Sequence, residues 1–354
     1  MTIDRSQPIT IALCGATGTG KSTFINDASG GDLPVGHAQN SCTENIAFAP
    51  PFEVDGVEVR LIDTPGFDDT TMSDTEILKR IGAFLQVSHM ENQYLSGLIY
   101  MHRITDNRVG GVSRRNFRVF RELVGPGALV NVVIVTNMWR DPIEPAELAR
   151  ERDLQENPMF FQPVLEKGAR MARYVRSQAP DSAHDIIRMF MENVPKPTYL
   201  GEALADRTAL EDTNPGKVLN EELQKLLDKQ KAELDELRAE LAQVKESERE
   251  LREELKADLK ETQDKYDETK AQIASLLEKN SKYKAKAKKF REENAESRGK
   301  IAELRNELDR LKEEIKVTKD PEEVKFLARQ VNKVEKAIYG ISGSVWNTIS
   351  SWFS

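Results

Sequence analysis

Short apolar runs alternate with helical patterns over roughly the first two hundred residues of the chain. Runs of apolar side chains predict strands at residues 8–14, 46–54, 57–63, 97–101 and 130–136. Apolar residues spaced three and four apart predict helices at 73–88, 113–124, 145–155, 164–176 and 182–193. This alternation is typical of an α/β fold: a mostly parallel sheet with helices on both faces and ligands at the carboxyl ends of the strands.

The pattern changes near residue 216, after which glycine is almost absent until residue 340. An apolar seam at heptad spacing runs from Leu223 to Ile315, and no proline interrupts residues 217–318. We therefore predict a long helix of roughly 140 Å. Such a helix cannot bury its seam alone, so we expect a coiled coil between chains. A hairpin that folds back in the weak stretch 278–300, or a solvated single helix, is the alternative.

Residues 15–22 read GATGTGKS, directly after the first predicted strand and before a helical stretch. A strand, a glycine-rich turn and a helix N-terminus form the phosphate-binding P-loop, in which backbone N–H groups converge on an anion. The lysine adds a charge toward the β and γ phosphates, and the serine hydroxyl binds Mg²⁺. The expected nucleotide contacts are Gly15, Ala16, Thr17, Gly18, Thr19, Gly20, Lys21, Ser22 and Thr23.

A second phosphate signal, DTPG at residues 63–66, ends the strand predicted at 57–63. Asp63 can hold Mg²⁺ through a water, and the Gly66 N–H can turn toward a γ-phosphate. Thr43, in the polar segment 29–43, is expected to complete the shell of metal ligands, and Ser41 is the alternative ligand. The predicted metal ligands are thus Ser22, Thr43 and Asp63, and the predicted catalytic residues include Lys21 and Gly66.

These motifs together resemble the translation-factor-related GTPases. Residues 11–23, 41–46 and 61–71 look most like the AIG/GIMAP-type and septin-like branch, and closest to fungal G-domain proteins that carry a C-terminal coiled coil. The resemblance covers roughly residues 7–195. It implies GTP and GDP binding with Mg²⁺, slow hydrolysis, and nucleotide-controlled association through the G domains.

Two positions depart from the pattern of that family. Residues 136–139 read TNMW where many such GTPases carry Asn/Thr-Lys-x-Asp, the guanine-reading motif. Asn137 can still bond a base edge, and Trp139 either stacks on the base or packs on a helix. Phe67 follows DTPG where a water-orienting Gln is common. Arg103, beside His102, is the candidate to face the phosphates or a second copy, with an exposed strand end as the alternative.

These motifs divide the chain into a P-loop G domain (1–195), a proline-containing linker (196–216), a coiled coil (217–318) and a C-terminal segment (319–354). Residues 340–354 carry no charge, and Ile341, Val345 and Ile349 recur at helical spacing. An uncharged amphipathic helix of this kind resembles lipid-packing sensors and is too short to span a bilayer. We expect peripheral membrane contact, with docking on the rest of the chain or disorder as alternatives.

Charge and cysteine content narrow the choice of function. The net charge is −8, with 51 basic and 59 acidic residues, which does not favour a nucleic-acid partner. The two cysteines form no disulfide framework and no signal-peptide pattern is present, so a cytoplasmic location is expected.

The sequence therefore predicts a GTP-binding protein with slow, association-dependent hydrolysis, acting as a nucleotide-switched oligomerising scaffold. The alternatives are a coiled-coil ATPase of the chromosome-maintenance type and a scaffold whose nucleotide site does not hydrolyse or select guanine.

Overall fold

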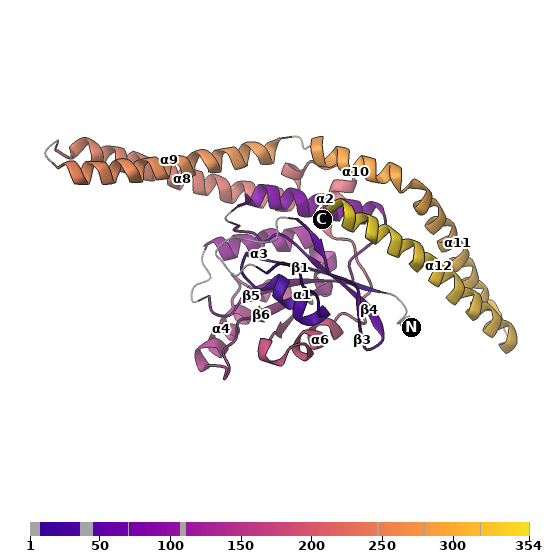
Figure 1. Ribbon diagram of the computed structural model, residues 1–354. Coiled ribbons are helices and arrows are strands. Elements are labelled where there is room, and N and C mark those ends of the chain that lie inside the picture. Colours follow the sequence, from indigo (N-terminus) through magenta and orange to yellow (C-terminus); the bar gives the residue numbers. More distant parts are fainter. Residues whose placement is uncertain are drawn as a thin grey trace.

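The computed structural model describes residues 8–35, 45–69, 71–106, 111–245, 248–278, 281–318 and 320–353. Its centre is a seven-stranded sheet in the order β2-β4-β1-β5-β6-β7, with β3 also paired to β4 (Figure 1). The strands are β1 (Ile9–Gly15), β2 (Ala47–Phe48), β3 (Phe52–Val54), β4 (Val57–Asp63), β5 (Gly97–Arg103), β6 (Val132–Asn137) and β7 (Arg170–Arg173). Only β2 and β3 run antiparallel to their neighbour, so the predicted α/β class is confirmed.

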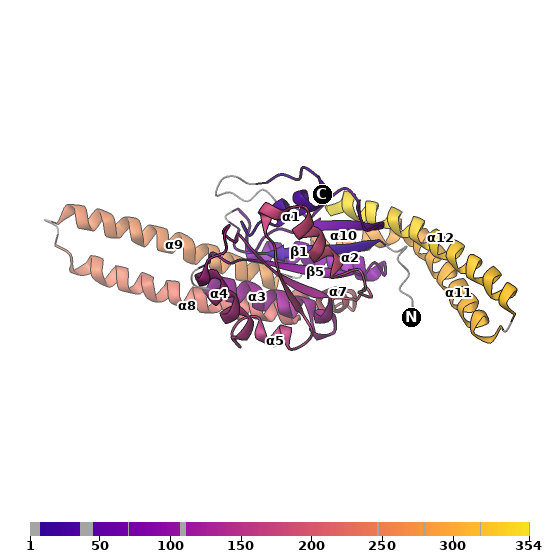
Figure 2. The same ribbon diagram turned by 90° about the horizontal axis from the view of Figure 1, so that it is seen from below.

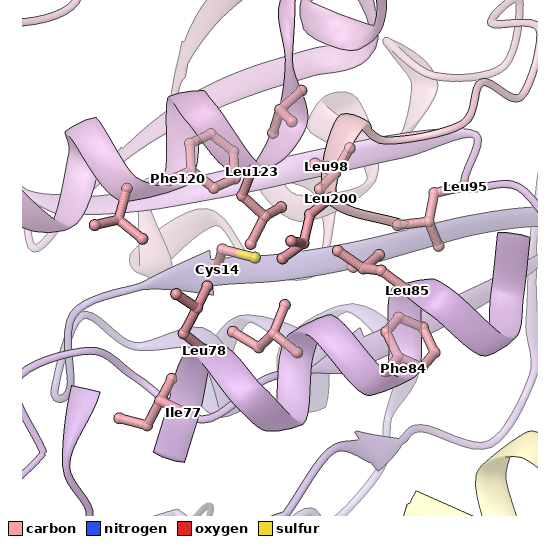
Figure 3. Packing of buried hydrophobic residues seen from close by; sticks show 14 of the residues in the cluster. Cys14, Ile77, Leu78, Phe84, Leu85, Leu95, Leu98, Phe120, Leu123 and Leu200 are labelled. Atoms are coloured by element: carbon pink, nitrogen blue, oxygen red, sulfur yellow. The ribbon is translucent and has the colours of Figure 1, made fainter. Parts of the chain in front are cut away.

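Alternate side chains of the central strand enter two separate cores because successive residues of a strand point to opposite faces. In β1, Ile11 and Leu13 join a core beneath α1 (Lys21–Ser29) and α6 (Asp181–Arg188). Ala12 and Cys14 join the core on the other face. Figure 3 shows Cys14 there, close to Leu78, Leu98 and Leu200.

Two further groups of helices complete the domain. The second core lies beneath α2 (Asp74–Met90), α3 (Gly111–Val124) and α7 (Tyr199–Ala205). The shorter peripheral helices are α4 (Pro145–Glu156), α5 (Gln162–Leu165), η1 (Pro126–Asn131), η2 (Arg176–Gln178) and η3 (Leu210–Asp212). The stretch predicted as a linker, 196–216, thus holds α7, and the side chain of Leu200 is fully buried in the core.

Two local predictions are wrong, and one edge strand was not predicted. The strand predicted at 46–54 is two strands, because Pro50 and Pro51 cannot donate to a ladder. The helix predicted at 164–176 ends after one turn, and Gly168, at φ 95°, leads into β7. This edge strand reads Arg-Met-Ala-Arg, without the apolar run that identifies the central strands.

The prediction of one long uninterrupted helix is also wrong. Residues 214–353 form α8 (Asn214–Gln243), α9 (Arg249–Leu277), α10 (Ser281–Glu293), α11 (Ala295–Val317) and α12 (Pro321–Phe353). Helices α8 and α9 pair as one projecting hairpin, and α11 and α12 as another (Figures 1 and 2). The seam is covered within the chain, with Leu234 and Leu255 buried. Folding back buries these residues without a second chain, at the cost of closing a short turn.

Helix α2 contacts α8, α9, α10 and α12, and α3 packs against α8. Lys79 Nζ donates to Ser275 Oγ of α9 at 2.6 Å. Arg298 of α11 pairs with the buried Glu91 at 3.0 Å. From α12, Trp346 lies with its ring centre 6.2 Å from that of Phe84. Within the described ranges, no helix combines the length and apolar character needed to cross a lipid bilayer.

Candidate nucleotide-binding site

The P-loop lies at the carboxyl end of β1, whose two neighbours in the sheet are β4 and β5. In doubly wound sheets this edge is where ligands bind. The strand ends at Gly15 and α1 begins at Lys21, so the predicted strand, loop and helix are present. Gly20, just before α1, has a φ of 89°. A β-carbon on Gly20 would lie 2.5 Å from Nδ2 of Asn137, so a side chain here would be strained and would displace the Asn137 amide.

Lys21 is held with its ammonium inside the loop. Its Nζ donates to the carbonyl oxygens of Gly15 at 3.2 Å and Ala16 at 3.1 Å, and the side chain is buried. Burial lowers the pKa of Lys21, while the nearby Asp63 carboxylate raises it. A buried ammonium with few counter-charges favours an anionic ligand, as expected for a phosphate-binding lysine.

Ser22 and Asp63 meet at the mouth of the loop. The Ser22 hydroxyl donates to the Asp63 carboxylate at 2.5 Å, and Asp63 ends β4 with only 1% of its surface exposed. Hydroxyl and carboxylate oxygens are ligands that Mg²⁺ takes alongside nucleotide phosphates. No cluster of three acidic, His or Cys residues that could hold a metal exists among the described residues. The pair therefore fits a metal shared with phosphates rather than an all-protein cage. Thr43 and Ser41 lie outside the described residues.

The DTPG segment packs directly against the P-loop. The Thr17 N–H donates to the carbonyl of Phe67 at 2.9 Å. A β-carbon on Gly66 would lie 2.6 Å from the Thr17 nitrogen and 2.8 Å from Nζ of Lys21. A side chain at Gly66 would therefore collide with the Thr17 backbone and crowd the Lys21 ammonium. The Phe67 side chain is buried in the core, so the residue offers the site only its backbone.

Asp74 and Arg115 hold the end of this segment, and sequence reasoning gave them no such role. Asp74 accepts from the Asp68 N–H at 2.8 Å and is ion-paired with Arg115 of α3. Burial raises the pKa of Asp74, and the Arg115 guanidinium opposes that shift. The sequence signal that could have pointed to Asp74 was the start of a helix at Ser73, whose side chain caps the N–H of Glu76.

Arg103 and His102 sit at the end of β5 with different surroundings. Arg103 Nη1 lies 3.6 Å from the position of a β-carbon on Gly18, so its guanidinium is beside the P-loop. It pairs with Asp106 at 3.1 Å and is 37% exposed. His102 is buried against Phe161, with ring centres 5.5 Å apart. Burial lowers the pKa of His102 to about 4, so it is a neutral core residue at pH 7.

The base-reading segment is arranged by Asn137 and Trp139. Asn137 is buried and donates from Nδ2 to the carbonyl of Thr19 at 3.0 Å, which ties β6 to the P-loop. Trp139 donates from Nε1 to the carbonyl of Thr136 at 3.1 Å. The guanidinium of Arg173 lies over the indole at 4.9 Å. Of the two readings of Trp139, these contacts favour packing over stacking on a base.

The fold and the loop define a P-loop α/β domain, and comparison with known proteins gives its class. Residues 10–111 match the family model described as 50S ribosome-binding GTPase. This region is similar to P-loop GTPase G domains. The AIG/GIMAP-type or septin-like branch stays a prediction.

A curated relative and several solved structures are similar to parts of the chain. GTP-binding protein A of Dictyostelium discoideum is 30% identical over 125 residues, which make up 35% of this chain and 27% of that protein. The match therefore spans about a quarter of the relative's length. Toc33 from Arabidopsis thaliana, solved with Mg²⁺ and GMPPNP, covers 53% of this chain and 84% of its own, at 15% identity and a TM-score of 0.41. The FeoB G-domain from Methanococcus jannaschii covers 53% and 99%, at 14% identity and a TM-score of 0.32.

Proposed function

We propose that the chain binds GTP and GDP with Mg²⁺ and hydrolyses GTP slowly. The observation that carries this proposal is the Ser22 hydroxyl on the Asp63 carboxylate, next to the buried Lys21 ammonium. They supply two oxygen donors and one cation of the kind that P-loop nucleotide sites use for Mg²⁺ and phosphate. The match of residues 10–111 to a GTPase family supports guanine as the base.

The position directly after DTPG offers the attacking water no side-chain partner, while Lys21 supplies electrostatic stabilisation. Lys21 balances phosphate charge, and the Gly66 backbone lies beside it. A water-orienting amide is common directly after DTPG, yet Phe67 turns its side chain into the core there. We therefore propose slow hydrolysis by an isolated chain, because positioning of the water contributes strongly to such reactions.

Association of two G domains is the second part of the proposal. Arg103, partly exposed beside Gly18, lies where a second copy facing the P-loop would meet it. Arginine is suited to this role because its guanidinium stabilises developing phosphate charge. The chain then acts as a nucleotide-switched scaffold in the cytoplasm, with self-association through the G domains.

Peripheral membrane contact through residues 340–354 is a separate proposal. The apolar stripe that motivates it is buried in the structure, where Trp346, Ile349 and Phe353 pack in the core with α2. Membrane binding therefore requires the end of α12 to leave this position. Flotation with liposomes before and after removal of residues 340–354 tests it, and equal flotation of both forms would argue against membrane contact by this segment.

The decisive experiment for nucleotide binding compares GTP, GDP and ATP by competition, with Lys21→Ala as the control. GTP and GDP are expected to bind at micromolar or lower concentration, and Lys21→Ala to lose most of this affinity. If ATP competes as strongly as GTP, the site does not select guanine. Hydrolysis measured over a dilution series tests association: the rate per chain should fall on dilution. Fast single-turnover hydrolysis by the dilute chain would contradict the proposal that hydrolysis depends on association.

A second candidate function keeps the nucleotide site without guanine selection or turnover. It is favoured by Trp139, which stands at the predicted base-reading position in place of an Asp and whose indole is held by Thr136 and Arg173. A missing bidentate acceptor costs discrimination of about a few kcal/mol. In this case the chain would bind nucleotide as a structural ligand of a scaffold.

A further inference from the structure

A cavity lies between the sheet and the α11–α12 hairpin, far from the P-loop. Its volume is about 230 Å³. Pro8 and Thr10 line it at the amino end of β1, whereas the P-loop follows the carboxyl end of the same strand. Seven residues of strand separate the two by about 20 Å. The cavity is therefore a separate site from the one assigned to nucleotide.

Both parts of the chain build its walls. The G domain contributes Arg60 of β4 and Tyr94, which precedes β5, while the hairpin contributes Arg305 of α11 and Trp346 of α12. Gln93 donates to Ser342 Oγ at 3.2 Å and closes one side. Tyr94 and Trp346 offer aromatic carbon surface. An apolar cavity of about 150 Å³ accommodates benzene, so this one has room for a ring and an acidic group.

The charges facing the cavity leave one positive group in excess. Arg60 pairs with Glu58 at 2.6 Å, and Glu335 pairs with Lys312 at 2.9 Å, so each of these charges is balanced. The guanidinium of Arg305 forms no hydrogen bond or ion pair with any described residue. Guanidinium groups bind carboxylate and phosphate through two parallel hydrogen bonds.

We propose that this cavity binds a small organic anion, made of an aromatic or apolar body and a carboxylate or phosphate group. Arg305 binds the anionic group, and the aromatic walls cover the body. Because the walls come from both the sheet and the hairpin, the bound anion stabilises the docked position of α11 and α12. Any ligand that binds only the assembled form acts in this way.

The test uses ¹⁹F NMR on the full chain with 4-fluorophenylacetate as the probe. The matched neutral probe is 4-fluorophenylacetamide, which has the same shape without the charge. The acid is expected to bind about tenfold more tightly than the amide, as one charge-assisted contact implies. Arg305→Gln should remove that preference. Arg310→Gln changes an arginine of the same helix that is exposed like Arg305 but does not line the cavity, and it should keep the preference.

Lys21→Ala separates this site from the P-loop. The proposal requires that this variant bind the acid as tightly as the original chain, whether or not nucleotide binding is confirmed. Equal affinity for acid and amide, an unchanged preference in Arg305→Gln, or loss of the preference in Lys21→Ala would each overturn the proposal. If neither probe binds at about 10 mM, the cavity holds only solvent, and the proposal is overturned as well.

Discussion

The Ser22 hydroxyl donates a hydrogen bond to the Asp63 carboxylate at 2.5 Å, which joins the first turn of α1 to the end of β4. The two residues are 41 positions apart in the chain and come from the two motifs that point to a phosphate site. Their oxygens lie together next to Lys21, whose ammonium is also buried. The Ser22 hydroxyl oxygen keeps lone pairs that a Mg²⁺ ion could take while the hydroxyl proton stays hydrogen-bonded to the Asp63 carboxylate.

Ser22→Ala is expected to remove the effect of Mg²⁺ on nucleotide affinity. The ratio of GDP affinity with Mg²⁺ to that in EDTA should be about tenfold smaller in the variant than in the original chain. The reason is the loss of one oxygen ligand of the metal, worth about 1.4 kcal/mol. Titration calorimetry with Mg²⁺ and with EDTA measures the difference. Because Ser22 does not hold the phosphates through its hydroxyl in this proposal, the two proteins should bind GDP similarly in EDTA. An equal Mg²⁺ effect in both would exclude Ser22 as a ligand.

Asn137→Ala is expected to weaken nucleotide binding without changing the preference between bases. Its amide holds the Thr19 carbonyl at 3.0 Å, so the substitution leaves that P-loop carbonyl without this donor. Loss of one such buried bond costs about 1 to 2 kcal/mol, or up to about thirtyfold in affinity if the loop is disordered. Competition by GTP and ATP measures both effects. Met138→Ala, at an exposed neighbouring position, is the control and should bind as the original chain does.

A drop in the GTP-to-ATP preference of Asn137→Ala would contradict this prediction. It would show that the amide bonds the base edge, the alternative left open by the sequence. Unchanged affinity would show instead that the Thr19 carbonyl does not need its partner to keep the loop in place.

His102 should make the fold sensitive to mild acid. Its pKa is lowered to about 4 by burial, below its ordinary value of 6.5, while Asp106 opposes the shift and Arg103 adds to it. As the pH falls, His102 of the unfolded chain binds a proton before His102 of the folded chain does. The free energy of unfolding therefore falls between about pH 6.5 and pH 4. At pH 5 this group alone accounts for a loss of about 2 kcal/mol relative to pH 7.5.

Urea unfolding at pH 7.5 and pH 5 measures that loss. His102→Leu should lose about 2 kcal/mol less than the original chain over the same interval. Titration of the His102 ring by NMR provides a second measurement, independent of how well the variant folds. A ring that titrates near 6.5 in the folded protein would contradict the prediction.

The central sheet could be predicted because its strands are buried and apolar, as β6, with its sequence Val-Val-Ile-Val-Thr-Asn, illustrates. Strand β7 could not, because at the edge its Arg170 and Arg173 need no burial. The P-loop was visible because backbone geometry imposes its glycines and lysine in a fixed local order. The ion pair of Asp74 with Arg115 was not, since the sequence carries no local mark of a contact between two helices.

The helical region shows a different limit of sequence reasoning. A heptad seam says that an apolar stripe must be covered, yet the same seam serves a partner chain or a folded-back neighbour. In this chain Leu234 and Leu255 are covered by the α8–α9 hairpin. The stretch 340–354 was ambiguous in the same way: its amphipathic pattern fits a membrane surface, but Phe48 and Phe84 cover Trp346.

Trp346→Ala should loosen the end of α12 from the G domain. The Trp346 side chain is 6% exposed, and its ring centre lies 6.3 Å from that of Phe48 and 6.2 Å from that of Phe84. Truncating a buried Trp costs roughly 3 kcal/mol, which is enough to raise the undocked population by about two orders of magnitude. Amide hydrogen exchange along residues 340–353 should speed up accordingly, while exchange in β1 and β5 stays slow. Phe326→Ala is the matched control, because this aromatic residue of the same helix is 59% exposed and should alter exchange little. Uniformly faster exchange in the sheet as well would mean that α12 belongs to one cooperative unit with the G domain, and that no separate undocking of the tail takes place.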